Sequence, residues 1–88
     1  MAEKVEYTKG ENPAVVLRRY MDSIEGGITV FDLAEKCRNK ISSGTINAIL
    51  EGKRKIDEDI SKEFSIAFKT PKKFFLDVQK EYDKTLKK

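Results

Sequence analysis

Residues 28–56 constrain the fold more than any other part of this chain. They contain two short segments with apolar residues at helical spacing, and each follows a hydroxyl residue suited to an N-cap: Thr29 for the first segment and Ser42 or Ser43 for the second. Gly52 follows the second segment, where a glycine commonly ends a helix, and a basic triplet comes next. Two short helices with a tight connection are the layout of a helix-turn-helix. The pattern therefore points to duplex nucleic acid as the partner.

Turn signals divide the rest of the chain into three further helices and no strand. The expected N-caps of these helices are Asn12, Asp57 and Thr70. Pro13 and Pro71 follow two of the caps at the first helical position, and Gly26-Gly27 ends the first helix. Each of the five helices carries apolar residues at helical spacing, and these are Val16, Leu17, Tyr20, Met21, Ile24, Val30, Leu33, Ala34, Cys37, Ile46, Ile49, Leu50, Ile60, Phe64, Ala67, Phe68, Phe74, Phe75, Val78 and Tyr82. The sequence thus predicts an all-α fold of five helices.

Length and composition limit the classes of protein that fit. Residues 1–11 are polar and lack periodicity, which predicts a flexible N-terminal arm before a single domain over residues 12–88. The chain has one cysteine and no histidine, so neither a disulfide within the chain nor an ordinary zinc site is expected, and no cofactor or other metal is implied. No apolar run approaches the roughly 20 residues of a membrane span. We expect a cytoplasmic, nucleoid-associated protein.

Charge is sorted along the chain although the net charge is only +3. Residues 41–56 hold three basic residues against one acid, and residues 57–68 hold one basic residue against four acids. The basic residues of the first segment follow its helix directly. A helix lying in the major groove would bring this connection alongside a phosphate strand.

The order of these features matches a known pattern over residues 17–82. The matching residues are Leu33-Ala34, Ser42, Ile46, Ile49, Leu50, Gly52-Lys53-Arg54, Ile56, Phe64, Ala67 and the ending TPKKFFLDVQKEYD. In these residues the chain resembles the Xre (Cro-type) family of helix-turn-helix regulators, and most closely its HigA-like antitoxin branch. The resemblance implies a compact five-helix bundle of the lambda-repressor type, a homodimer and operator binding. For the antitoxin branch it also implies neutralisation of a small RNase toxin.

Two departures from the family pattern concern the binding surface. Arg38, Asn39 and Lys40 make the connection between the two helices about two residues longer than usual, and they supply no glycine. The family reads base edges with long side chains at positions that here hold Ser43, Gly44 and Ala48. The resemblance therefore implies thin direct readout, because these side chains offer little to base edges.

The candidate site residues fall into three groups. Candidates for contacts to bases are Ser43, Gly44, Thr45, Asn47 and Ala48. Candidates for contacts to phosphates are Thr29, Lys40, Ser42, Lys53 and Arg54. Candidates for a dimer or partner surface on the last helix are Phe74, Val78 and Tyr82.

Two functions remain open at this point. The first is a sequence-specific transcriptional regulator, of the kind in which a HigA-like antitoxin represses its own operon and neutralises a partner toxin. In this case Asn47, the basic residues and DNA shape read by a dimer would supply specificity. The second is a protein-interaction module that keeps the helix-turn-helix fold with little or no base-specific binding.

An enzyme is not expected. Asp57, Glu58 and Asp59 could be imagined as an acid/base or metal cluster, but at a helix start they point in different directions and favour the helix dipole. Cys37 has no histidine to activate it and shares a face with Leu33, so it is expected to be a small buried hydrophobe.

Overall fold

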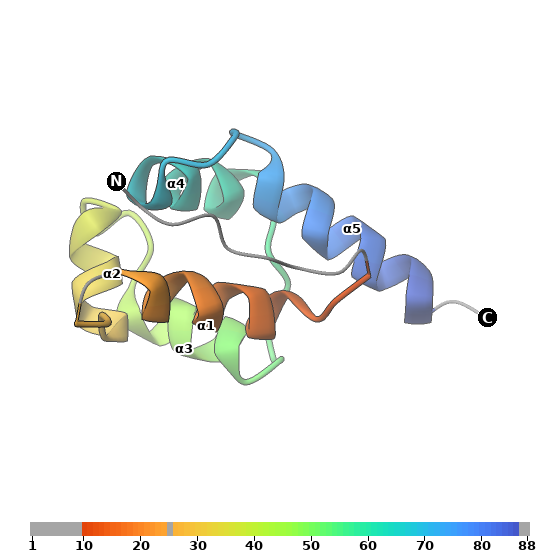
Figure 1. Ribbon diagram of the computed structural model, residues 1–88, viewed down its shortest axis with the longest axis horizontal. Helices are drawn as coiled ribbons and strands as arrows, with labels where there is room; N and C mark the ends of the chain where they lie inside the picture. The colour runs from red at the N-terminus through yellow and green to blue at the C-terminus, as the bar shows by residue number, and fades with distance from the viewer. Residues whose placement is uncertain (1–9, 25, 87–88) are drawn as a thin grey trace.

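The structure, a computed structural model, describes residues 10–24 and 26–86 (Figure 1). Its elements are α1 (Pro13–Ser23), α2 (Val30–Lys36), α3 (Ser43–Leu50), α4 (Glu58–Phe68) and α5 (Phe74–Leu86), and the described residues contain no strand. The prediction of an all-α fold with five helices is confirmed. On one side of the molecule α3 packs against α1 and α2, and on the other α4 packs against α5, while α1 also contacts α5.

Local signals decide where four of the helices begin. The side chains of Asn12, Thr29, Ser42 and Asp57 each accept a backbone N–H from the first turn of the following helix, at 2.9–3.2 Å. These bonds satisfy donors that a helix start otherwise leaves unpaired. At Thr29 the bond is reciprocal, because Asp32 Oδ2 accepts the Thr29 N–H at 3.0 Å and completes a capping box. Four of the five expected N-caps are confirmed, and Ser42 rather than Ser43 is the cap of α3.

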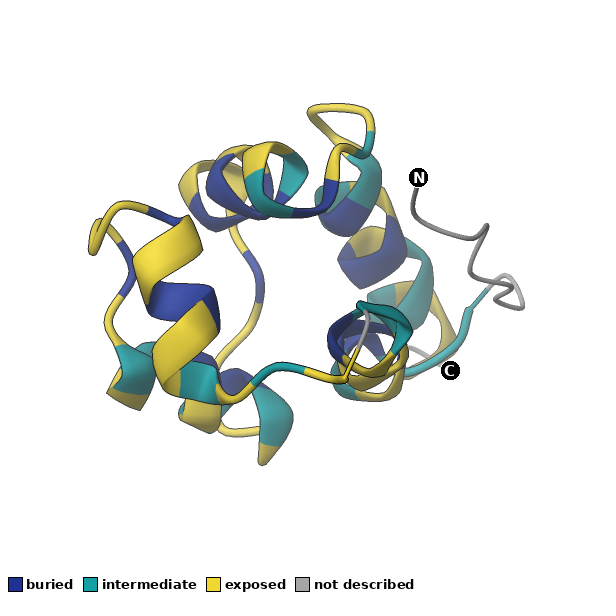
Figure 2. Ribbon diagram, turned by 60° about the vertical axis from the view of Figure 1, so that its left-hand side comes forward, coloured by how far each residue is buried: buried dark blue, intermediate teal, exposed yellow. Residues whose placement is uncertain are grey.

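The core is one continuous cluster to which every helix contributes. Figure 2 shows buried segments on the faces that the helices turn towards one another, with exposed segments outside. The side chains with the least exposure include Leu17, Leu33, Ile46, Phe64 and Phe75, each at 0%. The apolar stripes read from the sequence therefore face inward. Because α2 and α3 are short, this burial is what holds them in place.

The start of α5 differs from the prediction. Thr70 was expected to cap a helix opening at Pro71, but α5 begins at Phe74 and a turn precedes it, with the Phe74 N–H donating to Pro71 O at 3.0 Å. The Thr70 hydroxyl is buried and has no hydrogen-bond partner among the described residues. The prediction of Thr70 as an N-cap is therefore wrong.

Ser61 of α4, and not Thr70, supplies the side-chain hydrogen bond to the first turn of α5. Its hydroxyl donates to Lys72 O at 2.9 Å and accepts the Leu76 N–H of the first turn of α5 at 3.0 Å. Ser61 is buried, so these two bonds are shielded from water. One hydroxyl thus fixes both the turn and the helix start from a neighbouring element.

We expect Ser61→Ala to lower the free energy of unfolding by about 1–3 kcal/mol, because the Lys72 carbonyl and the Leu76 N–H would lose their partner. Urea unfolding followed by circular dichroism measures this. Ser65→Ala is the matched control, since the Ser65 hydroxyl bonds only to Lys62 O of its own helix at an exposed position. That control should change stability by less than about 0.5 kcal/mol. Equal effects of the two substitutions would contradict the role of Ser61.

Candidate nucleic-acid interface

α3 carries the five candidate base contacts on one short helix. Its inner side is held by Ile46 and Ile49, both buried against the core. Gly44 and Asn47 are exposed, and Ser43, Thr45 and Ala48 are partly exposed. The five positions therefore reach the surface together, as a helix entering a groove requires. Asn47 has the longest of these side chains and is the one able to make a paired contact with adenine.

The two hydroxyl candidates for phosphate contact sit at helix N-termini. Thr29 and Ser42 are exposed, and their oxygens already accept the N–H of Asp32 at 3.2 Å and of Thr45 at 3.1 Å. The Ser42 and Thr45 hydroxyls also lie 3.0 Å apart, in hydrogen-bond contact. Helix N-termini favour anions through their free N–H groups and dipole. α3 has eight residues, and its start combines this dipole with two hydroxyls at the surface.

The end of α3 sets the path of the three basic residues 53–55 that follow it. Gly52 has φ +78°, and the N–H groups of Gly52 and Lys53 donate to Ile49 O at 3.1 Å and Ala48 O at 2.8 Å. This pair of bonds is a Schellman motif, which confirms Gly52 as the helix-ending residue. It turns the chain sharply, so that residues 53–55 leave the helix as an exposed loop.

The cations of this loop are partly neutralised by the chain's own acids. Lys53 Nζ lies 3.5 Å from Glu51 Oε1, and Arg54 Nη2 lies 3.6 Å from Asp57 Oδ2. Both pairs are exposed, so each contributes little to stability and can be exchanged for a phosphate. Lys40, at the other end of α3, forms no ion pair with another described residue. Candidate cations therefore stand before and after α3, but only Lys40 is free of an acid partner.

The longer connection between α2 and α3 is made without glycine. Arg38 and Asn39 adopt left-handed backbone conformations, with φ of +56° and +59°. Asn39 N–H donates to Ala34 O at 2.9 Å and Lys40 N–H donates to Cys37 O at 3.0 Å. A left-handed residue with a Cβ costs roughly 1–2 kcal/mol, less for asparagine. Buried Ile41 then anchors the chain before α3 begins.

A cavity of about 470 Å³ lies between this connection and α4. Lys40, Thr45 and Arg54 line it, so three of the predicted site residues come together there. Its other charged lining residues are Asp57, Asp59, Lys62 and Glu63. Cations and acids are therefore balanced in the cavity, and an isolated anion gains little by entering it.

Glu63 is a buried acid that the sequence pattern does not single out. Its Oε1 has no hydrogen-bond partner among the described residues, and Arg38 Nη2 lies 3.8 Å from it. The Cys37 thiol lies 3.8 Å from Glu63 O. The longer connection and α4 are thus coupled by one ion pair and one weak hydrogen bond.

Gln79 of α5 positions the loop that follows α3. Its side chain is buried, its Oε1 accepts the Ile56 N–H at 2.9 Å, and its Nε2 donates to Asp83 Oδ1 at 3.0 Å. Lys55 Nζ lies 3.5 Å from the same Asp83 oxygen. The fifth helix therefore fixes the far end of the basic loop. No local pattern reveals this, because Gln79 and Ile56 are far apart in the sequence.

The predicted dimer or partner surface needs one correction. Val78 is 1% exposed and belongs to the chain's own core, so it cannot lie on a surface in this conformation. Phe74 is partly buried against Tyr20 and Phe75, and Tyr82 is partly buried with its hydroxyl 3.5 Å from Asn12 Nδ2. The largest exposed apolar side chain on α5 is Leu86. Helical spacing places Val78 on the apolar stripe of the last helix, but spacing alone does not tell whether the chain's own core or a partner covers that stripe.

Comparisons with known proteins add no relative. No protein-family model matches the chain, and neither the curated proteins nor the solved structures yield a match. No helix in the described residues is long and apolar enough to cross a membrane. The same part of the chain contains no group of three or more acidic or cysteine side chains arranged to hold a metal ion. The predicted arm lies outside the described residues except for Gly10 and Glu11, of which Glu11 pairs with Arg19 of α1.

Cys37 is buried, as its position on the inner face of α2 predicts. Burial, with a further contribution from the negative charge of Glu63, raises the pKa of the thiol from 9.0 to about 11. Above pH 9 the unfolded chain releases this proton while the native state keeps it. Stability from this group is therefore complete below pH 9 and is lost as the pH rises towards 11, a loss of about 2–3 kcal/mol.

Between pH 8 and pH 11 we expect the free energy of unfolding of the wild-type protein to fall by about 2–3 kcal/mol more than that of Cys37→Ala. The difference isolates the thiol, because the two proteins are identical at every other position. Urea unfolding over this pH range measures it, and thiol-reagent kinetics at pH 8 should show protection until the chain unfolds. Identical pH profiles for the two proteins would contradict the burial of a protonated thiol.

We expect Gln79→Ala to lower the free energy of unfolding by about 1–3 kcal/mol, because the Ile56 N–H would be buried without an acceptor. Amide hydrogen exchange should show faster exchange at Ile56 than at the α1 amides. Lys80→Ala removes a neighbouring exposed side chain and is the control. Unchanged exchange at Ile56 would show that Gln79 does not hold the loop.

Proposed function

We propose that this chain is a DNA-binding transcriptional regulator that presents α2 and α3 to the duplex as a helix-turn-helix. The observation that carries the proposal is the arrangement of α3. Its inner side is fixed by Ile46 and Ile49, and its outer side places five short polar or small residues at the surface. Exposed cations stand at both of its ends.

The N-terminus of α3 supports this proposal. Ser42 places the capped start of α3 at the surface, where no acid of its first turn opposes a phosphate oxygen, whereas the start of α2 already holds the Asp32 carboxylate beside Thr29. Contacts of this kind fix the register of a helix in the groove. Asn47 is then positioned to read a base, and Ala48 to touch a thymine methyl group.

The resemblance to HigA-like antitoxins extends the proposal. In this form the protein is a homodimer that represses its own operon and neutralises a small RNase toxin. Dimerisation is assigned to α5, where Phe74 and Tyr82 are partly exposed and Leu86 is exposed. Two copies would double the phosphate contacts, which offsets the short side chains on α3. The site of action is the nucleoid within the cytoplasm.

A second candidate function is a protein-interaction module, and one observation favours it. Phe31 on α2 is 71% exposed, the most exposed of the large apolar side chains in the described chain. An exposed aromatic residue is common at the centre of a protein interface and offers nothing to a phosphate strand. The pairing of Lys53 and Arg54 with acids also lowers the attraction for DNA.

The first test is selection from a random duplex pool with the purified protein, followed by a salt titration of the best sequence and of a scrambled duplex. We expect enrichment of a two-fold symmetric site, with binding that weakens as salt rises. Equal binding to both duplexes would overturn sequence-specific regulation and favour the interaction module.

Variants of the basic loop make the test specific to α3. Lys53→Ala with Arg54→Ala should reduce the slope of log affinity against log salt by about 2, because two phosphate contacts are lost. The matched control is Lys55→Ala with Lys84→Ala, which removes the same charge from cations that face acids of α5. That control should keep most of the slope. A protein binder would retain its partner in both variants, and substituting Phe31 would then abolish binding.

A further inference from the structure

A second cluster of cations lies where α4 leads into α5. Its members, Lys69, Lys72 and Lys73, are all exposed. Residues 64–76 contain all three of them and no acid. We refer to these three lysines as the α4–α5 corner. The nearest acids along the chain are Glu63, which is buried, and Asp77, which is exposed in the first turn of α5.

The corner lysines differ from the basic loop after α3 in having no acid partner. Lys53, Arg54 and Lys55 of that loop each form an ion pair with an acid of the chain, at 3.5–3.6 Å. None of the three corner lysines forms an ion pair with another described residue, and near α3 the same is true of Lys40. The corner therefore gathers three uncompensated positive charges away from the helix that the sequence assigns to DNA.

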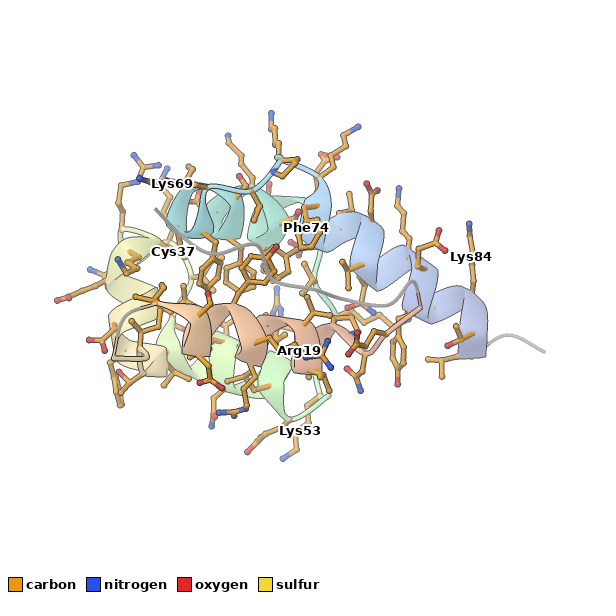
Figure 3. The ribbon with its side chains drawn as sticks, viewed as in Figure 1. Arg19, Cys37, Lys53, Lys69, Phe74 and Lys84 are labelled. Carbon is orange, nitrogen blue, oxygen red and sulfur yellow. The ribbon has the colours of Figure 1, made fainter. Side chains whose placement is uncertain are left out.

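The corner and α3 lie on opposite sides of the molecule. In Figure 1 the connection between α4 and α5 and the helix α3 are separated by α1. Figure 3 shows Lys69 and Lys53 on these opposite sides. The molecule extends 38 × 26 × 21 Å along its principal axes. A duplex held against α3 would leave the corner facing away from it.

We propose that the α4–α5 corner binds the phosphate backbone of a second duplex, so that one chain joins two DNA segments. This proposal rests on the proposed function, in which α3 holds the first duplex. Flexible ammonium groups without acid partners suit a backbone that presents spaced negative charges and no apolar face. Contact to phosphates alone carries no sequence information, so the second duplex is bound irrespective of sequence.

The apolar content of the corner argues for a nucleic acid over a membrane or an acidic protein. Ile66 is its one large exposed apolar side chain among the described residues, at 49%. A helix that lies in a membrane surface needs a broad apolar face, and a protein interface needs an apolar centre. One isoleucine supplies neither, whereas a phosphate strand requires only the cations.

A bead assay tests the proposal directly. A duplex carrying the selected site is fixed to beads, protein is added, and capture of a second fluorescent duplex of scrambled sequence is measured at 50 and 200 mM salt. The corner variant is Lys69→Gln with Lys72→Gln and Lys73→Gln. Its control, Arg18→Gln with Lys80→Gln and Lys84→Gln, removes the same charge from exposed positions on α1 and α5.

We expect wild type and the control to capture the second duplex and the corner variant to lose at least ten-fold in capture, because about three phosphate contacts disappear. The corner variant should still bind the fixed site with near wild-type affinity. Undiminished capture by the corner variant, for example through a dimer with two α3 faces, would overturn the proposal. So would wild-type protein that binds its site and captures nothing, and this outcome leaves the proposed function intact.

Two further measurements separate the remaining explanations. If no site is selected but the corner substitutions still weaken binding to any duplex, the role of α3 fails and the joining of two duplexes fails with it, and the corner remains as a phosphate-binding surface only. Sedimentation with vesicles of 70% phosphatidylcholine and 30% phosphatidylserine tests the membrane. Binding to vesicles that depends on the corner lysines, with no capture of a duplex, would overturn the proposal in favour of an anionic lipid surface.

Discussion

Two helices of seven and eight residues are too short to persist in water alone, so α2 and α3 exist only while their inner faces are buried. Leu33, Ile46 and Ile49 supply this burial, packed with Leu17 of α1 in the common core. Every property of the candidate interface depends on these contacts. They decide which residues of α3 are left outside, and they set the direction in which its N-terminus points.

An aromatic cluster holds the other half of the molecule to α1. Tyr20 lies 5.4 Å from both Phe68 and Phe75, measured between ring centroids, and Phe64 lies 5.3 Å from Phe75. Tilted and edge-on contacts of this kind add roughly 0.5–1.5 kcal/mol each to the burial of the rings. Because Tyr20 and Leu17 belong to the same helix, α1 joins the aromatic cluster to the core beneath α3. The two halves of the molecule therefore cannot move independently without breaking this contact.

Features that depend on residues close in the sequence were predicted correctly, whereas features that depend on a residue distant in the sequence were not. Asn12, Thr29, Ser42 and Asp57 act within three residues of themselves, so their caps could be read directly. Thr70 has the same local signature, yet Ser61, nine positions earlier, supplies the bond that starts α5. A tertiary partner overrides a local preference there, as it does at Val78, whose exposure depends on which elements cover it.

In the candidate site, too, local features were predicted and tertiary contacts were not. Spacing placed Ser43, Gly44, Thr45, Asn47 and Ala48 on a helix that reaches the surface, and the structure has them there. Their contact with DNA stays a prediction, because exposure is necessary for it and does not establish it. Two contacts of the loop after α3 could not be predicted from the sequence, because both depend on how this loop folds back. They are the ion pair of Arg54 with Asp57 and the hydrogen bond of Ile56 with Gln79.

Electrostatics then constrains how a protein of this kind could bind DNA. Ion pairs with Glu51 and Asp57 must exchange for phosphates before Lys53 and Arg54 contribute, so the gain from each is smaller than for a free cation. The side chains on α3 add little direct readout, since Asn47 alone can make a paired base contact. One copy would therefore bind weakly and with little preference. Affinity and specificity for that site would have to come from a partner copy, which adds a second, symmetric set of contacts. The unpaired lysines at the α4–α5 corner face away from the duplex held by α3, so they add only charge, directed at a second duplex.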